Sequence, residues 1–345
     1  MREIVDEIRR WQDRGEAVAL ATVVQTWGSA PRKVGAKMAI SENGRMVGSV
    51  SGGCIEGAVA EKAMEVLKGG PPQLLEFGVA DELAWEVGLA CGGSLRVFVE
   101  ALDDQIYPAI ERLVGQERSF AVVTLLAGPA EMVGRKQLIL EQGDPIGTFG
   151  ADFDAGVMAA LQAAMAEGRS QAVELEGSGD ELFIDVLLPP PTLVMVGGVH
   201  IAIALTAIAK TLGYRTVVID PRHAFGSGDR FAHVDRLIQA WPEEAFAQLT
   251  LDNATAIALL THDPKIDDPA LNVVLRSPAF YVGALGSRTT HAERVKRLRE
   301  QGIEDGLIDR IQGPIGLDIN AQTPEEIAVA IMAEIIDKRH RPIIG

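Results

Sequence analysis

The amino-acid sequence predicts a two-domain α/β protein, in which residues 1–188 form a mixed α/β domain and residues 189–345 form a doubly wound, mostly parallel sheet. Three observations lead to this prediction. A proline triplet at residues 189–191 interrupts the chain. An uncharged apolar run at residues 193–196 is typical of a strand buried on both faces. A glycine turn, a helical pattern and a second apolar run ending at Asp220 then follow, as in a Rossmann-like unit.

In the first domain, hydrophobic periodicity and turn residues place the elements in order. The first eleven residues have apolar side chains at helical spacing, and Gly15 closes this predicted helix. Asn43-Gly44 between two apolar segments predicts a β-hairpin. Strands are expected at residues 17–24, 37–40, 46–50, 74–77, 95–99, 120–126, 172–175 and 182–188. Helices are expected at residues 58–67, 81–87 and 154–166, with another beginning near Ile106, and a second hairpin is expected around residues 141–144. An internal boundary near Asp103 is an alternative to one continuous domain.

The second domain continues the alternation of strands and helices. Strands are expected at residues 193–196, 216–219, 234–238, 256–260 and 280–282. Helices are expected at residues 201–212, 243–249, 269–275, 288–299 and 323–338. Gly213 fits the carboxyl end of its helix, and Thr323 followed by Pro324 fits a helix start.

Composition excludes several classes of function. The 345 residues carry a formal net charge of −16 and contain no basic run, so we expect no nucleic-acid partner. No apolar stretch has membrane-spanning length, and the N-terminus lacks a signal-peptide core, so we expect a cytoplasmic protein without membrane attachment. Two cysteines do not make a disulfide framework in such a chain. We detect no internal repeat in the sequence.

The glycine turn of the second domain departs from the dinucleotide-binding fingerprint. That fingerprint places glycines at positions 197, 199 and 202, and here they are Gly197, Val199 and Ala202. The branched Val199 obstructs the approach of a pyrophosphate to the backbone. We therefore expect the fold without ordinary dinucleotide binding. An NAD(P)-dependent oxidoreductase is the alternative, and a turn that binds nothing is the third interpretation.

Ligands of doubly wound sheets bind beyond the carboxyl ends of the strands. The candidates there are Gly197, Gly198, His200, Asp220, Arg222, His262, Gly286, Ser287 and Arg288. The last three combine a glycine, a hydroxyl and a guanidinium at a helix start, which suits an anion, although a capped helix with a solvated arginine fits equally well. Asp220 could hold a ribose hydroxyl, or Arg222 a phosphate. The two histidines lack metal-ligand spacing, so we expect no metal site.

The two cysteines have glycine-rich surroundings. Cys54 follows Gly52-Gly53 at the start of a predicted helix, and Cys91 precedes Gly92-Gly93 before a predicted strand. The amides and dipole of a helix N-terminus stabilise a thiolate. Flanking glycines would leave the sulfur open to a bulky ligand. The alternative is two small buried residues in tight turns.

Several blocks of the sequence resemble the xanthine dehydrogenase accessory (XdhC/CoxI) family. In the first half these blocks are residues 26–31, 48–57 and 85–93, which include both cysteines. In the second half they are residues 220–222, 260–265, 283–288 and 313–319. Residues 103–191 contribute little to the resemblance. Two departures are Val199, where relatives have a glycine-richer turn, and Gln312, where histidine is common.

The resemblance implies a chaperone that binds the molybdenum cofactor (molybdopterin) as cargo. Members of the family support sulfuration of this cofactor together with a cysteine desulfurase, and deliver it to a molybdenum hydroxylase such as xanthine dehydrogenase. Turnover by the protein itself is not required, and a homo-oligomer is compatible with the sequence. Cys54, together with Cys91, would lie near the dithiolene or molybdenum, or would relay sulfur. The cofactor would sit between the cysteine loops and the Rossmann-like domain, with glycine amides and Arg288 at its phosphate. We further expect Cys54 and Cys91 to approach each other, and a bound phosphate to lie nearer Ser287 and Arg288 than Val199.

Overall fold

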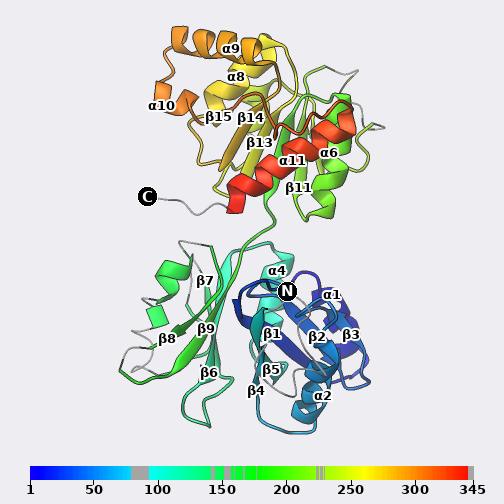
Figure 1. Cartoon of the computed structure of the whole chain (residues 1–345), viewed down its shortest axis with the longest axis vertical. Helices are drawn as coiled ribbons and strands as arrows, with labels where there is room; N and C mark the ends of the chain where they lie inside the picture. The colour runs from blue at the N-terminus through cyan, green and yellow to red at the C-terminus, as the bar shows by residue number, and fades with distance from the viewer. Residues whose placement is uncertain are drawn as a thin grey trace. The chain divides into compact units, whose positions relative to one another are not determined.

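The computed structural model describes residues 1–78, 93–140, 144–150, 157–158, 160–165, 168–175, 177–222, 225, 228 and 230–340. The chain divides into two compact units, Met1–Pro189 and Pro190–Gly345, and each is described by itself (Figure 1). The α/β class and the parallel C-terminal sheet are confirmed. The helix predicted at residues 81–87 and the turn at residues 141–143 lie outside the described residues.

The first sheet of the N-terminal unit has five antiparallel strands in the order β3-β2-β1-β5-β4. Its elements are α1 (Val5–Gln12), β1 (Val18–Trp27), β2 (Lys37–Ser41), β3 (Met46–Gly48), α2 (Glu56–Leu67), β4 (Gln73–Phe77) and β5 (Ser94–Ala101). Alternate residues of β1 point to opposite faces of the sheet. Leu20 packs in the cluster that contains α1, and Ala21 packs in the cluster that contains α2. The two helices therefore cover opposite faces of the sheet.

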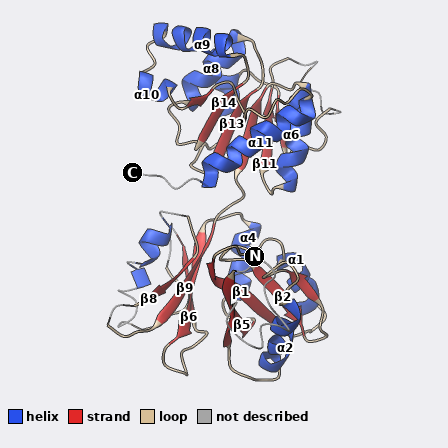
Figure 2. Ribbon diagram, in the orientation of Figure 1, coloured by secondary structure: helices blue, strands red, loops and turns tan. Residues whose placement is uncertain are grey.

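A second antiparallel sheet follows, in the order β7-β6-β9-β8. Its elements are α4 (Tyr107–Gly115), β6 (Phe120–Ala127), β7 (Lys136–Leu140), β8 (Gln171–Glu174) and β9 (Glu181–Leu187). The order of its strands repeats the order β2-β1-β5-β4 of the first sheet, and both sheets are visible in Figure 2. An isolated bridge between Leu138 and Ile146 occupies the place of the β2–β3 pairing.

The repetition extends to the pairing register. Thr22 pairs with Lys37 between β1 and β2, as Thr124 pairs with Lys136 between β6 and β7. Leu20 pairs with Glu100 and Val122 with Asp185, and the registers of β1 and β6 shift at the same point along each strand. The segments from α1 to β5 and from α4 to β9 therefore form an internal repeat. The sequence interpretation, which found no repeat, is wrong on this point.

The two halves are joined by reciprocal ion pairs in the interior. Lys37 Nζ lies 2.7 Å from Asp185 Oδ2, and Lys136 Nζ lies 2.6 Å from Glu100 Oε2. Each lysine also donates a hydrogen bond to a threonine of its own half, at 3.3 Å for Thr22 and 3.1 Å for Thr124. These groups line a cavity of about 30 Å³. The reciprocity is that of a twofold-symmetric interface, in which residue i contacts j and residue j contacts i.

A third ion pair joins two residues that occupy equivalent positions in the two halves. In β5, Arg96 lies opposite the first residue of β1 that is paired after the register shift. In β9, Glu181 lies opposite the corresponding residue of β6. The two side chains form a bidentate pair with each other, with nitrogen–oxygen distances of 2.6 and 2.8 Å. Equivalent residues contact each other only at a twofold axis, so this pair marks the axis of the repeat.

The C-terminal unit is built on six parallel strands in the order β12-β11-β10-β13-β14-β15. The strands are β10 (Thr192–Val196), β11 (Arg215–Ile219), β12 (Arg236–Ile238), β13 (Thr255–Leu259), β14 (Tyr281–Ala284) and β15 (Ile311–Gln312). The helices are α6 (His200–Thr211), α7 (Pro242–Phe246), α8 (Pro264–Val274), α9 (Arg288–Glu300), α10 (Asp305–Ile308) and α11 (Pro324–His340). The strand order reverses between β10 and β13, and ligands bind at such a switch point.

Most predicted elements of this unit occur within a few residues of their expected places, and α8 is the main exception. It begins at Pro264, whereas the sequence predicts a helix at residues 269–275. Asp263 caps α8 by accepting a hydrogen bond from the backbone of Lys265 at 3.0 Å, and a proline is well tolerated in a first turn. Pro269 therefore lies inside the helix rather than at its start. The short elements α10 and β15 were not predicted.

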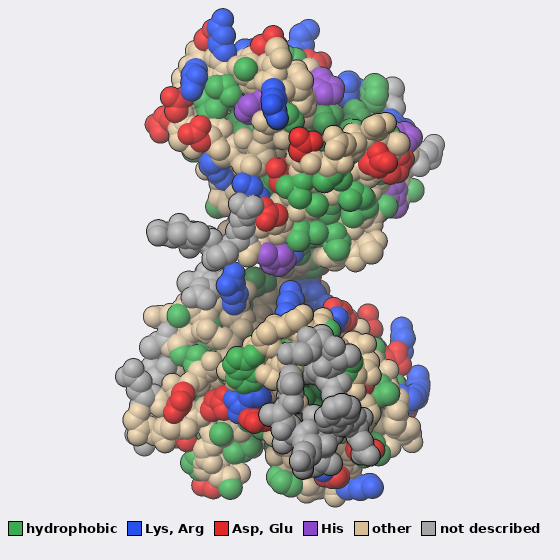
Figure 3. Space-filling view, in the orientation of Figure 1, with side chains coloured by type: hydrophobic (Ala, Val, Ile, Leu, Met, Phe, Trp, Pro, Cys, Tyr) green, Lys and Arg blue, Asp and Glu red, His purple; other side chains and the backbone are tan. Residues whose placement is uncertain are grey.

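Helices α6 and α11 pack against each other on one face of the parallel sheet. Hydrophobic side chains gather on the surface over these two helices (Figure 3). Val329 of α11 is 49% exposed. Within the part of the chain that is described, no helix is both long and apolar enough to cross a membrane.

Candidate functional site

Cys54 lies on the turn between β3 and α2, and we call residues 49–55 the cysteine loop. Gly52 and Gly53 adopt φ angles of 81° and 120°, a region that residues with a side chain rarely adopt. The loop places Cys54 two residues before the first residue of α2, with an exposed, free thiol. The alternative of a buried structural cysteine therefore does not describe Cys54.

The carboxylate of Glu56, the first residue of α2, lies at the centre of the cysteine loop. Oε1 accepts hydrogen bonds from the hydroxyl of Ser49 (2.7 Å) and from the amides of residues 50 (3.2 Å), 51 (2.9 Å) and 52 (3.1 Å). Oε2 accepts from the hydroxyl of Ser51 (2.5 Å) and from the amides of residues 53 (2.9 Å) and 55 (3.2 Å). The amides of Gly52 and Gly53 are thus engaged inside the loop.

These hydrogen bonds determine the charge of Glu56. Partial burial raises the pKa of the carboxyl group, but the hydroxyls of Ser49 and Ser51 and the backbone amide of Ser51 outweigh it and hold the pKa at about 2. Hydrogen bonding to the charged form of an acid has this effect. The loop therefore encloses a permanent negative charge at physiological pH.

The segment from Trp27 to Pro31 contacts glycines of both cysteine-bearing regions. A Cβ added to Gly52 would lie 3.7 Å from Pro31, and one added to Gly93 would lie 2.5 Å from the carbonyl oxygen of Ser29. Trp27 is 48% exposed beside this contact. Cys91 and Gly92 lie outside the described residues, so the expected approach of Cys54 and Cys91 stays a prediction.

In the C-terminal unit, the glycine turn is closely packed. Gly197 has a φ angle of 113°, and a Cβ there would lie 2.6 Å from the methyl group of Thr261. A Cβ at Gly198 would lie 2.4 Å from the carbonyl oxygen of Phe225. One face of Gly198 is therefore closed by the chain that follows β11. The side chain of Val199 packs against the hydrophobic cluster that contains residues of α6 and α11.

Asp220 is fully buried and bonded within the protein. Its carboxylate accepts hydrogen bonds from the amide of Gly198 (2.7 Å) and from the guanidinium of Arg222, through Nε (2.9 Å) and Nη2 (2.7 Å). Burial raises the pKa of Asp220, but the Arg222 bonds and the Gly198 amide outweigh it and lower the pKa. Arg222 in turn stacks on the ring of Phe225, 4.2 Å from its centroid. These contacts stabilise the glycine turn and leave Asp220 no exposed oxygen for a ribose.

The two candidate histidines of this unit lie on its surface. His200, at the start of α6, has a side chain 69% exposed, with Nε2 3.7 Å from Oε1 of Glu325 on α11. His262 is exposed after β13. Among the described residues, no group of three or more His, Cys, Asp or Glu side chains has an arrangement that could hold a metal ion.

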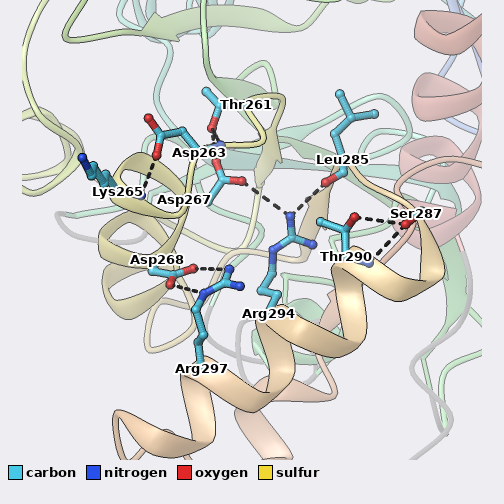
Figure 4. A network of polar contacts seen from close by, with 10 residues as sticks. All are labelled: Thr261, Asp263, Lys265, Asp267, Asp268, Leu285, Ser287, Thr290, Arg294 and Arg297. Atoms are coloured by element: carbon cyan, nitrogen blue, oxygen red, sulfur yellow. Dashed lines mark hydrogen bonds and ion pairs between the residues drawn. The ribbon is translucent and has the colours of Figure 1, made fainter.

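The turn Gly286-Ser287-Arg288 lies where β14 leads into α9. Ser287 caps α9 by accepting a hydrogen bond from the Thr290 amide at 3.1 Å, and Arg288 is exposed as the first helical residue. Arg294 lies beneath this turn and is 1% exposed (Figure 4). Its Nη2 donates to the carbonyl of Leu285 at 2.9 Å, whereas Nε and Nη1 are buried without a hydrogen-bond partner in the described part of the chain. The positive helix end and the buried guanidinium both favour an anion here.

A set of contacts connects this turn to the neighbouring strand ends. Arg294 Nη2 lies 3.5 Å from Oδ2 of Asp267 on α8, and the hydroxyl of Thr261 donates to Oδ1 of the same carboxylate. Burial raises the pKa of Asp267, although Thr261 and Arg294 oppose the shift. Thr261 also contacts Gly197. The parallel register thus brings the predicted residues that follow β10, β11, β13 and β14 to one edge of the sheet.

Sequence reasoning missed three residues of these sites. Glu56 is part of the motif at residues 48–57, and the serines at positions 49 and 51 were a signal that a carboxylate could be bound there. Trp27 was noted only as part of a loop, although an exposed tryptophan beside glycines is unusual. Arg294 gave no separate signal, because a basic helix ordinarily exposes its arginines.

Comparisons with known proteins connect both units to the same group of proteins. Residues 11–78 match the XdhC and CoxI family, and residues 193–335 match the XdhC Rossmann domain. The chain is 30% identical over 332 residues to a probable xanthine dehydrogenase subunit of Bacillus subtilis (strain 168), and the match covers 96% of this chain and 95% of that protein. It is 27% identical over 326 residues to the "Molybdenum cofactor insertion chaperone PaoD" of Escherichia coli (strain K12), covering 94% of this chain and 84% of that protein.

A solved structure is similar over nearly the whole chain. It is the crystal structure of a protein described as a xanthine dehydrogenase from Bacillus halodurans, with a TM-score of 0.79 and 25% sequence identity. The similarity covers 99% of this chain and 97% of that chain. Both units of the fold are therefore shared with that protein.

Proposed function

Because this chain belongs to the XdhC and CoxI family, we propose that it binds the molybdenum cofactor as cargo and supports its sulfuration and insertion into a xanthine dehydrogenase-type molybdenum hydroxylase. Two relatives support this proposal. One is named as a molybdenum cofactor insertion chaperone, and the other is named as part of a xanthine dehydrogenase. The client is then a molybdenum hydroxylase, and a cysteine desulfurase supplies the sulfur. The protein acts as a carrier and needs no turnover of its own.

The exposed thiol of Cys54 on a tightly bonded loop is the observation that carries the proposal. A thiolate is a soft ligand and a sulfur nucleophile, so it suits contact with molybdenum or relay of sulfur. The glycines before Cys54 leave room for a large ligand, since a Cβ at Gly53 would meet no atom within 4 Å. Trp27 offers an exposed aromatic face on which a pterin ring can stack.

In the C-terminal unit, we propose that Ser287 and Arg288 bind a phosphate, either of the cofactor or of a nucleotide. Arg288 supplies an exposed guanidinium, and Arg294 adds a buried positive charge beneath the turn. Gly197, Gly198, Asp220 and Arg222 then shape the neighbouring turn rather than contact a dinucleotide. The closed face of Gly198 and the engaged carboxylate of Asp220 argue against an NAD(P)-dependent oxidoreductase.

Purification from a molybdenum-replete host tests the proposal. Wild-type protein should carry molybdenum and pterin together, and Cys54→Ala should retain about tenfold less of both, which corresponds to about 1.4 kcal/mol of binding free energy. Ser178→Ala is a suitable control, because Ser178 is exposed on a different turn of the same unit. Wild-type protein without molybdenum and pterin, or equal retention in Cys54→Ala, would contradict the proposal.

A further inference from the structure

We propose that Glu56 is the positioning residue of the cysteine loop: its carboxylate fills the ring of donors at residues 49–55, fixes Cys54 outside that ring, and keeps oxoanions of the cargo away from the loop amides. This inference deepens the proposed function and rests on it for its relevance to the cofactor. The geometry of the loop supports it independently.

The hydrogen-bond donors of the cysteine loop form a ring around one carboxylate. Two hydroxyls and five backbone amides of the loop point at one carboxylate. Successive amides that converge in this way form an anion-binding concavity, as in loops that bind phosphate. Here the anion is supplied by the chain itself, so an external phosphate would have to displace Glu56.

The hydroxyl of Ser51 connects Glu56 to Cys54. The hydroxyl of Ser51 donates to Oε2 of Glu56 at 2.5 Å and accepts a hydrogen bond from the amide of Cys54 at 3.0 Å. Ser51 is 1% exposed, whereas Cys54 is exposed. The carboxylate thereby determines the backbone position of Cys54 through one buried hydroxyl.

The test measures alkylation of Cys54 by iodoacetamide, quantified at the Cys54 peptide by mass spectrometry so that Cys91 does not interfere. We expect Glu56→Ala to change the rate about fivefold, which corresponds to about 1 kcal/mol, the net contribution of one typical hydrogen bond. Sodium formate should restore the wild-type rate in Glu56→Ala, because formate is the missing carboxylate. Glu61→Ala removes an exposed acid from the same helix and should show neither effect.

Inorganic phosphate tests the exclusion of oxoanions. It should slow alkylation in Glu56→Ala, whose ring is empty, and leave the wild-type rate unchanged. Equal protection by phosphate in both proteins would overturn the exclusion. Should Glu56→Ala not fold, Glu56→Gln keeps the size of the side chain and serves for the same rate measurement, with a changed rate expected and no response to formate.

The positioning role would be overturned if the Glu56 variants were alkylated at the wild-type rate and formate did not change the rate of Glu56→Ala. These measurements use protein without cofactor, so they stand apart from the proposed function. If wild-type protein fails to retain molybdenum and pterin but the formate result holds, the proposed function is wrong and the role of Glu56 in placing Cys54 remains.

Discussion

Lys37 and Asp185 form an ion pair at 2.7 Å in the interior of the N-terminal unit, with side chains 5% and 9% exposed. Lys136 and Glu100 form the matching pair, in which the second half supplies the lysine and the first half supplies the carboxylate. Burial raises the pKa of Glu100, which Lys136 opposes by its proximity. Removing charges from water is costly, and each pair is tolerated because each lysine has a carboxylate and a hydroxyl in contact.

Breaking one pair should destabilise the N-terminal unit strongly. Lys37→Met leaves Asp185 as a buried carboxylate without its cation, and we expect a loss of about 3–5 kcal/mol. Amide hydrogen exchange of β1 and β6 measures this loss in the intact chain. Because the halves repeat, Lys136→Met should cost a similar amount, while Lys37→Met combined with Asp185→Leu should recover most of it. A cost below about 1 kcal/mol, typical of exposed pairs, would show that the pair is accessible to water.

Because of Glu56, the stability of the cysteine loop should depend on pH. Its folded-state pKa of about 2 is below its ordinary value of 4.5. Its contribution is therefore fully present above about pH 4.5 and is lost as the pH falls toward about 2. Glu56→Gln should melt below the wild type at pH 7, and the gap should narrow from pH 4.5 downward. A gap that is independent of pH over this range would mean that the charge of Glu56 does not contribute.

Restoring a glycine at position 199 should not create a dinucleotide site. Val199→Gly removes the branched side chain, but the backbone of Phe225 still closes one face of Gly198 and Asp220 stays bonded to Arg222. We expect no rise in melting temperature with NAD(H) or NADP(H) for the wild type or for the variant. A rise in the wild type, or NAD pyrophosphate bound on the backbone of residues 197–199 in a crystal, would favour the oxidoreductase alternative.

The turn before α9 should bind phosphate through Arg288. Arg288→Gln should weaken binding of inorganic phosphate about tenfold, since charge-assisted hydrogen bonds contribute about 1.5–3 kcal/mol. Lys296→Gln removes a charge from the exposed face of the same helix and should have a much smaller effect. Phosphorus NMR titration of both variants measures the difference. Equal weakening by the two substitutions would indicate a diffuse electrostatic effect instead of a site.

Local pattern was sufficient to predict most elements of the C-terminal unit and its parallel sheet. The runs at residues 193–196 and 216–219 became β10 and β11, because parallel strands buried on both faces need continuous apolar residues. Cys54 was correctly placed before a helix. The helix start at Pro264 was not predicted, because the pattern indicated a start at Pro269. In the structure, Pro269 lies inside α8.

What escaped prediction depends on contacts between distant residues. The internal repeat preserves identity at few positions, such as Lys37 and Lys136. Elsewhere it preserves only the kind of residue, as in Leu20 and Val122 or Glu100 and Asp185. Asp220 was expected at a ligand, but the neighbouring Arg222 and the amide of Gly198 satisfy it. Whether a carboxylate faces solvent or the backbone depends on such partners, which spacing along the sequence does not reveal.

The most direct test of the account is anaerobic titration of the purified protein with isolated molybdenum cofactor. We expect one cofactor per chain with a Kd of about 1 µM or tighter, which corresponds to about −8 kcal/mol. Cys54→Ala should bind about tenfold more weakly, while its unfolding free energy changes by no more than about 1 kcal/mol, because the thiol is exposed. Absence of binding by the wild type, or equal affinity of the wild type and Cys54→Ala, would contradict the central claim that Cys54 binds molybdenum cofactor as cargo.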